Sequence, residues 1–170
     1  RLQMQDLNAV VQDALRGAGE SLVRRRVRLV KKLAPDLPPL LLDAPRIRRV
    51  VDNVMAFALE NVLVGGRVRV ESRRAGGYAV VEVAHDGPRS AGDLLEHLFV
   101  PFASGAAGAA GGLGVAQQIV REHGGEIRVR SEGEWSAIFS CTLPVRENED
   151  RRRRTDRRSG RNDRRRRPAA

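Results

Sequence analysis

The sequence predicts an α+β fold, a two-layer α/β sandwich in which helices cover one face of a mixed sheet. Some segments carry apolar residues at helical spacing, and others alternate apolar and polar residues as strands do. In chain order the predicted elements are α β α β β, a glycine-rich connection, and α β β. The other face of the sheet is expected to meet solvent or a partner.

The boundaries of these elements follow from capping and turn residues. Gly17 and Gly19 are predicted to end the first helix, and Asp43 is a good N-cap for the second. A turn at residues 75–77 is predicted to join two strands in a hairpin. Helices are predicted over residues 6–18, 45 to about 62, and about 113 to 123; strands are predicted over residues 26–33, 67–72, 78–84, 126–131 and 136–143.

A glycine-rich stretch, residues 111–132, organises the second half of the chain. A loop is predicted to enter the last helix at about Leu113, and a loop of this kind at a helix N-terminus can bind an anion through backbone N–H groups and the helix dipole. By itself the stretch is equally consistent with a flexible loop followed by an ordinary amphipathic helix. Residues 91–99 are predicted to hold a short helix, and residues 100–112 a mobile lid.

The charge is distributed unevenly along the chain, whose formal net charge is +10. Residues 147–170 contain 11 arginines and 5 acidic residues. This segment has no apolar periodicity, so we expect a domain at residues 1–146 followed by an Arg-rich disordered tail at 147–170. Two interpretations of the tail remain open: electrostatic binding to nucleic acid or an anionic membrane surface, or a solvated linker without a specific partner.

Composition also excludes several classes of protein. The single cysteine, Cys141, rules out an internal disulfide and a cysteine-based metal site, and favours a reducing compartment. No apolar run is long enough to cross a bilayer. The chain opens on Arg1, so we expect it to be a piece of a longer protein whose membrane anchor or sensor lies elsewhere.

Five pieces of the sequence, in this order, resemble the ATP-binding catalytic domain of two-component sensor histidine kinases. They are DLNAVVQDAL followed by LPPLLLDAPRIRRVVDNV; DNVMAFALEN; VEVAHDGP; LFVPF; and GGLGVAQQIVREHGGEIRVRSE with FSCTLP. The resemblance covers about residues 2–144. It implies the Bergerat-type ATP-binding fold shared with gyrase, the heat-shock chaperones and the mismatch-repair ATPases. ATP would lie between the helix bearing Asn53 and the lid, with Mg²⁺ bridging its phosphates.

The resemblance also implies partners. The γ-phosphate would pass to a histidine on a dimerisation hairpin of the same protein, outside this chain, and then to a response regulator. His85, His97 and His123 all fall inside the nucleotide domain, so none is a natural phosphate acceptor. The implied location is cytoplasmic, and the chain could be the cytoplasmic part of a membrane-bound sensor.

The positions that would hold the metal depart from the family. Asn53 matches the first of two family asparagines, which leaves it as the candidate metal ligand, but the Mg²⁺-holding second asparagine is replaced by Phe57. Phenylalanine has no ligand atom, whereas Mg²⁺ demands oxygen. Phe57 is expected to project toward the phosphates. Glu60, the candidate catalytic residue, and Asn61 lie about one turn further on and could substitute as metal ligands.

The positions that would hold the nucleotide are altered in part. His85 stands where the family has an aspartate whose carboxylate accepts a hydrogen bond from the adenine amino group. A neutral imidazole can also accept one hydrogen bond, so His85 could take over this role. The alternative is that His85 is a turn residue that binds no ligand. Gly87 matches the next glycine, Arg89 replaces another and is a candidate phosphate contact, and Asp86 is expected to point to the other side. Gly112, Leu113 and Gly114 match the phosphate loop.

Core-facing features of the family are thus kept while ligand-facing ones are changed. The sequence predicts the ATP-binding domain of a sensor histidine kinase in which binding of ATP and Mg²⁺ is weak or lost and phosphoryl transfer is weak or absent. Two alternatives stay open: a non-catalytic pseudokinase scaffold that acts by protein–protein binding, and a protein that acts through its basic tail.

Overall fold

The computed structural model describes residues 1–89 and 109–146, and in this part of the chain a five-stranded mixed sheet forms one layer. The strands lie in the order β2-β4-β5-β7-β6; β2 pairs with β4 in parallel, and the other pairs are antiparallel. Their bounds are β2 (Arg28–Leu33), β4 (Arg67–Ala75), β5 (Tyr78–His85), β6 (Glu126–Glu132) and β7 (Trp135–Pro144). The predicted mixed sheet is therefore confirmed.

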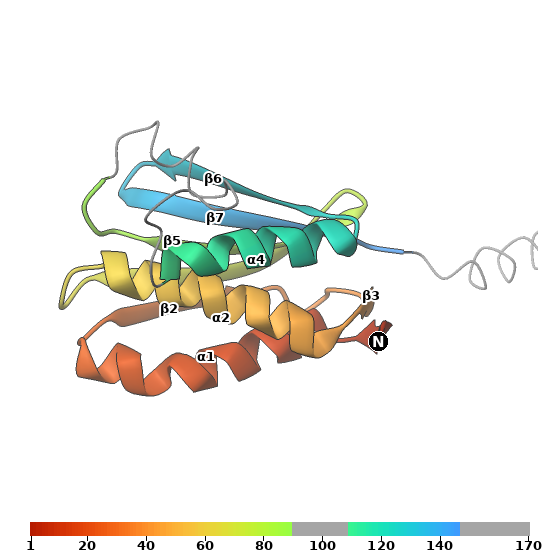
Figure 1. Cartoon of the computed structure of the whole chain (residues 1–170), viewed down its shortest axis with the longest axis horizontal. Helices are drawn as coiled ribbons and strands as arrows, with labels where there is room; N and C mark the ends of the chain where they lie inside the picture. Colours follow the sequence, from red (N-terminus) through yellow and green to blue (C-terminus); the bar gives the residue numbers. More distant parts are fainter. Residues whose placement is uncertain (90–108, 147–170) are drawn as a thin grey trace, which may run out of the picture.

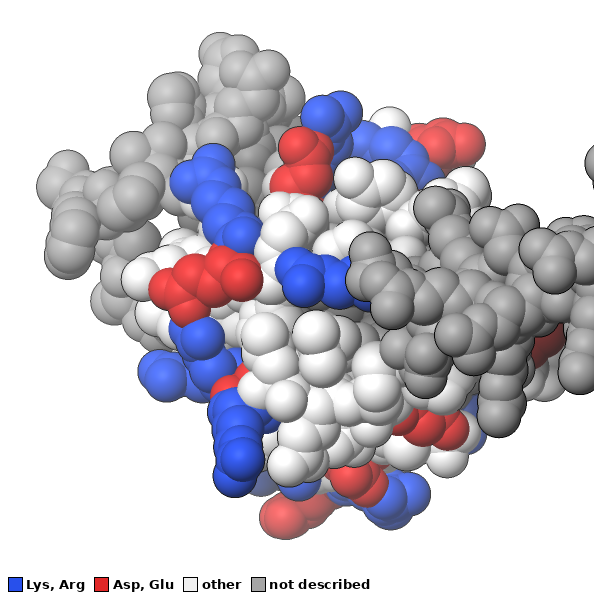
Figure 2. All heavy atoms as spheres, turned by 90° about the vertical axis from the view of Figure 1, so that its right-hand side faces the viewer, with Lys and Arg blue, Asp and Glu red and all other residues white. Residues whose placement is uncertain are grey.

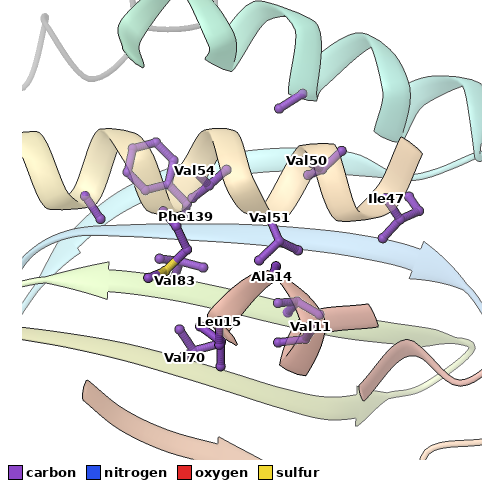
Figure 3. Close-up of a cluster of buried hydrophobic side chains, with 14 of the residues drawn as sticks. Val11, Ala14, Leu15, Ile47, Val50, Val51, Val54, Val70, Val83 and Phe139 are labelled. Atoms are coloured by element: carbon purple, nitrogen blue, oxygen red, sulfur yellow. The ribbon is translucent and has the colours of Figure 1, made fainter. Parts of the chain in front are cut away.

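Three helices, α1 (Leu7–Arg24), α2 (Ala44–Asn61) and α4 (Ala109–Glu122), cover one face of this sheet, as predicted (Figure 1). Helix α2 lies between the other two. Its apolar stripe, together with that of α1, meets the helix-facing residues of the strands, so one core joins the two layers (Figure 3). The core shown there includes Val11, Ala14, Leu15, Ile47, Val50, Val51, Val54, Val70, Val83 and Phe139.

A second, two-stranded sheet was not predicted. Strand β1 (Gln3–Gln5) pairs antiparallel with β3 (Leu40–Leu42), and Leu40 and Leu42 are buried. Three-residue strands that meet only in the tertiary structure give too little periodicity to be recognised in sequence. This sheet lies at the end of the molecule that carries the N-terminus, where basic and acidic side chains are mixed around uncharged residues (Figure 2).

Helix α1 is longer than predicted. It continues past Gly17 and Gly19 to Arg24, because Leu22 in its last turns is buried in the core. The chain leaves the helix at Arg26, which has a left-handed backbone with φ of 51°. The N-terminal boundary was correct, since the Asp6 side chain accepts hydrogen bonds from Asn8 and Ala9 N–H groups.

Helix α4 begins earlier than predicted, at Ala109 instead of Leu113. Gly111, Gly112 and Gly114 therefore lie in its first turns and not in a loop ahead of it. A Cβ at Gly112 would lie 3.1–3.3 Å from atoms of Asn53, so a glycine here lets α4 approach α2 closely. The predicted helix at 91–99 and most of the predicted lid lie outside the described residues.

The far end of α4 is joined to α2 by His123, a buried residue. Its Nδ1 lies 2.7 Å from the Ile119 carbonyl oxygen, and its Nε2 accepts the Asp43 N–H at 3.1 Å. The Asp43 carboxylate in turn accepts the Arg46 N–H, which confirms the predicted N-cap.

Among the helices of the described residues, none combines the length and apolar character that crossing a bilayer requires.

Leu113 provides a test of how α4 is packed. Its side chain is fully buried, so Leu113→Asp places an unpaired carboxylate in the core and should lower the free energy of unfolding by several kcal/mol. Thermal unfolding followed by circular dichroism measures this. Gln118→Asp, on the exposed side of the same helix, is the control and should change stability little. Equal melting temperatures for the two variants would contradict the packing described here.

Candidate functional site

The candidate site lies where the C-terminal half of α2, the start of α4 and the end of β5 meet (Figure 1). Asn53 connects the two helices: its Nδ2 donates to the Gly112 carbonyl at 2.9 Å. Leu113, next along α4, turns its side chain into the core, and Gly114 has open space where a side chain would be. Asn53 and Gly112 are thus brought together by a direct bond within the protein.

Phe57 is part of the core. Its side chain is only 6% exposed, and its ring meets that of Phe139 edge-on, with ring centroids 5.3 Å apart at an interplanar angle of 75°. On another side the ring lies 6.4 Å from the imidazole of His85. The expectation that Phe57 projects outward toward phosphates is corrected: the ring packs between α2 and the sheet, because burial of an aromatic side chain is strongly favourable.

The two polar residues that follow Phe57 on α2 differ in their surroundings. Asn61 Nδ2 donates to the carbonyl of Phe57 at 2.8 Å, so this amide serves the last turn of its own helix. Glu60 is exposed. Within residues 1–89 and 109–146 no group of three histidine, cysteine or acidic side chains could hold a metal ion. At the position of Phe57 the structure therefore presents a phenyl ring and no oxygen ligand.

His85 is the polar group at the centre of the site, and only 3% of it is exposed. Its Nδ1 accepts a hydrogen bond from the Gly87 N–H at 3.1 Å. Burial lowers the pKa of His85, and the Asp86 carboxylate opposes this only in part, so the ring is neutral at pH 7. A neutral imidazole that accepts at Nδ1 carries its proton on Nε2. The one acceptor that a neutral imidazole offers is thus already used by the Gly87 N–H.

The turn after β5 is fixed by close packing around Gly87. A Cβ at this position would lie 2.0 Å from the carbonyl oxygen of Asn61, which makes glycine necessary. The Ser136 hydroxyl on β7 donates to the Gly87 carbonyl. The turn is therefore held between the end of α2 and the sheet, and this contact keeps the Gly87 N–H aimed at His85.

Arg89 was expected to be available to phosphates, and the structure places its guanidinium elsewhere. Nη1 donates to the Ser131 hydroxyl at 2.8 Å, and Nη2 donates to the Gly133 carbonyl. Both acceptors belong to the β6–β7 hairpin, so Arg89 ties the turn to that hairpin and is not brought to Gly112. The sequence gives no signal for this contact, because an exposed hairpin tip has no pattern that selects a partner.

Asp86 points away from the site, as expected. Its two carboxylate oxygens accept from the backbone N–H of Arg67 at 2.8 Å and from the Arg67 Nε at 3.0 Å. Burial alone would raise the pKa of Asp86, but the hydrogen bonds from Arg67 outweigh it, and the pKa is lowered. Of two adjacent titratable residues, only His85 therefore faces the helices.

The domain thus combines helices over one face of a mixed sheet with an asparagine on α2 that bonds to a glycine at the start of α4. The family model described as histidine kinase-, DNA gyrase B- and HSP90-like ATPase matches residues 42–147. The chain belongs to this family, which confirms the resemblance seen in the motifs.

Two of the relatives that the chain matches in sequence are a sensor protein and a sensor histidine kinase. The chain is 36% identical to the alginate biosynthesis sensor protein KinB of Pseudomonas aeruginosa over 71% of its own length and 21% of the relative. It is 30% identical to the sensor histidine kinase ZraS of Escherichia coli over 85% of its length and 31% of the relative. The chain therefore spans about a fifth to a third of the curated relatives that it matches.

Solved structures show the same fold. The catalytic domain of the histidine kinase ThkA superimposes with a TM-score of 0.78 at 21% identity, covering 85% of this chain and 97% of that one. The mycobacterial sensor histidine kinase MprB gives 0.73 at 23% identity, covering 87% of this chain and 100% of that one. The predicted two-layer fold is confirmed by these neighbours.

Gly87 allows a test of the fixed turn. Gly87→Ala forces a Cβ against the Asn61 carbonyl and should lower the free energy of unfolding by about 1–3 kcal/mol. Gly114→Ala is the matched control, because it adds a methyl group in open space on a helix and should raise stability by about 0.5–1 kcal/mol. Chemical denaturation measures both. A Gly87→Ala protein as stable as the parent would show that the turn is not packed in this way.

Proposed function

We propose that the chain is the nucleotide-binding domain of a two-component sensor histidine kinase and that it does not catalyse phosphoryl transfer at a useful rate. Family membership and the sensor kinases among its relatives support the first part. The rest of such a protein would supply the histidine-bearing dimerisation hairpin, and the domain would act on the cytoplasmic side. A response regulator is the expected partner, since ThkA has been solved in complex with the response regulator TrrA.

The single observation that supports the loss of catalysis is the burial of Phe57 between Phe139 and His85. Phosphoryl transfer in other enzymes relies on positioning and on neutralisation of phosphate charge by metal ions. A phenyl ring at the family's metal-ligand position offers no oxygen, and within residues 1–89 and 109–146 no group of three histidine, cysteine or acidic side chains could hold a metal ion.

The other polar groups near the site are also committed within the protein. The Asn53 amide donates to Gly112, and the guanidinium of Arg89 binds the β6–β7 hairpin. Each bond would have to break before the group could serve a phosphate. The domain is therefore proposed to signal by its conformation and by protein–protein contacts, with weak nucleotide binding that depends little on Mg²⁺.

Restoration of the family residues tests this proposal. The parent chain should bind a fluorescent ATP analogue weakly, with little change on addition of Mg²⁺, and should not phosphorylate a competent histidine hairpin supplied in trans. Phe57→Asn should increase Mg²⁺-dependent binding, and the double variant with His85→Asp should increase it further. Titrations with and without Mg²⁺, combined with a phosphorylation assay, measure these effects.

Stability must be followed in the same experiment, because Phe57 is a core residue. Replacement of a buried phenylalanine by a smaller side chain commonly costs about 3–5 kcal/mol. Phe57→Leu is the matched control, since it also reduces the ring packing but adds no oxygen, and it should not gain Mg²⁺ dependence. Micromolar, strictly Mg²⁺-dependent binding and phosphoryl transfer by the parent chain would refute the proposal and direct attention to Glu60 or Asn61.

The charge of residues 147–170 favours a second role, electrostatic attachment to nucleic acid or anionic lipid. A chain truncated after Arg146 should keep its melting temperature and lose any salt-sensitive binding to duplex DNA or to vesicles containing phosphatidylserine. Fluorescence anisotropy and vesicle sedimentation at two salt concentrations measure this. Binding that survives truncation would exclude the tail as its cause.

A further inference from the structure

Strand β2 lies at one edge of the five-stranded sheet, next to a dense group of cations. Between residues 24 and 32, six of the nine residues are arginine or lysine. One of the six, Arg25, donates to the carbonyls of Leu59 and Val62 at the end of α2. The other five are exposed, and none of them belongs to an ion pair in the described part of the chain: Arg24, Arg26, Arg28, Lys31 and Lys32. We refer to β2 with these five residues as the basic edge.

The other edge strand of the sheet, β6, also carries charged residues, but they are paired. The Arg128 Nε lies 2.7 Å from a carboxylate oxygen of Glu126. Arg130 lies 3.1 Å from Glu132 and 3.0 Å from Glu82. Because these arginines are neutralised within the protein, β6 attracts an acidic molecule less strongly than the basic edge does.

The backbone of β2 presents hydrogen-bonding groups along the same edge. The Arg28 N–H donates to the Gly66 carbonyl at 2.9 Å, and the Ala34 N–H donates to the Ser72 carbonyl at 3.2 Å. Even-numbered residues of this strand therefore direct their backbone groups toward β4. The odd-numbered residues direct theirs away from the sheet, where no strand of the described residues pairs with them: Leu29, Lys31 and Leu33.

The side chains of β2 alternate between the two faces of the sheet. Val68 of β4 is fully buried in the core and lies opposite Leu29. Leu29 and Leu33 therefore face the helices, with one lysine between them, and both pack against the core. Arg28 and Lys32 lie on the other face, which has no helices. A chain added beside β2 would thus meet two cations on one face and two leucines on the other.

We infer that β2 is a docking edge for an acidic, extended segment of another protein, which pairs with it as an additional strand. Hydrogen bonds to the outward backbone groups would hold the segment, and its carboxylates would lie beside Arg28 and Lys32. Like charges directly opposite each other are unfavourable, so the same cations oppose pairing with a second copy of β2. Nucleic acid and lipid can neutralise the charge, but neither has a peptide backbone to continue the sheet, so the free edge favours a polypeptide.

Peptide binding to the full 170-residue chain tests this docking edge. The probe is a fluorescent, end-capped peptide, Glu-Val-Glu-Val-Glu-Val-Glu, which in extended form places every carboxylate on one face. The control peptide has the same residues in the order Glu-Glu-Val-Val-Glu-Glu-Val. Fluorescence anisotropy at physiological salt should show the alternating peptide bound about tenfold more tightly. The basic residues 147–170 attract both peptides alike, because the two have equal charge.

Methylation of the peptide backbone separates strand pairing from simple charge attraction. Two further versions of the alternating peptide carry N-methyl groups, one on the valines and the other on the glutamates. Backbone N–H groups of one set only face β2 in an added strand, so one version should lose binding and the other should keep it. Equal binding of both N-methylated versions would overturn the inference.

Charge reversal locates the binding on β2. Arg28→Glu combined with Lys32→Glu should weaken binding of the alternating peptide about tenfold. The control is Arg49→Glu combined with Arg128→Glu, which changes the net charge equally at exposed residues of α2 and β6 and should weaken binding about twofold at most. Equal losses in the two double variants would show that net charge, and not β2, attracts the peptide, and this would overturn the inference.

Lys31 tests the backbone directly. Lys31→Pro removes an N–H that points away from the sheet, so the pairing of β2 with β4 is kept, but the preference for the alternating peptide should be lost. Lys31→Ala removes the charge alone and should weaken binding about threefold at most. A proline variant that folds and binds as the alanine variant does would contradict strand addition; if the proline variant does not fold, the N-methylated peptides give the same test.

Duplex DNA and vesicles containing phosphatidylserine are titrated against the Arg28→Glu, Lys32→Glu variant in parallel. A variant that loses binding to either of these but still binds the alternating peptide as the parent does would overturn the inference and assign the basic edge to a nucleic acid or a membrane. None of these measurements involves nucleotide or phosphoryl transfer, so the proposed function is judged separately.

Discussion

The packing of α2 is the constraint on which the rest of the domain depends. This helix touches both neighbouring helices and lies over the middle of the sheet, and eight of its residues are buried. Its N-terminus is connected to the end of α4 through Asp43 and His123, and its C-terminal half contacts the start of α4 through Asn53. Displacement of α2 would therefore disturb the core and the candidate site together.

The candidate site differs from an open ligand pocket in how its polar groups are used. Asn53, Asn61 and Arg89 each bond to another group of the protein, and the ring of Phe57, on the same helix as the two asparagines, packs against Phe139. Buried polar groups are stable only when they are paired, so internal pairing makes the site rigid and leaves few groups for a ligand.

The sheet face without helices is covered by its own side chains. The carboxylate of Glu82, whose side chain is 5% exposed, lies 3.0–3.4 Å from guanidinium nitrogens of Arg69, Arg73 and Arg130. Arg67 and Arg69 also stack on Trp135, with guanidinium carbons 5.2 and 5.1 Å from the ring centroid. Long arginine stems thus shield the strands on this face.

The sequence by itself determined the larger helices and strands, the mixed sandwich, the cap at Asp43, and the family. These follow from apolar periodicity, capping residues and short motifs, which are local properties of the chain. It also showed which family positions are replaced, at Phe57, His85 and Arg89, since a replacement can be read from one position at a time.

The tertiary structure decided what those replacements do. Phe57 is buried because Phe139, far along the chain, lies opposite it; the Gly87 N–H sets the tautomer of His85; and Arg89 binds a hairpin instead of facing α4. The same holds for the length of α1, which the burial of Leu22 extends beyond two glycines. In each case the direction of a side chain, or the end of a helix, depends on contacts between distant segments. A local sequence pattern does not predict such contacts.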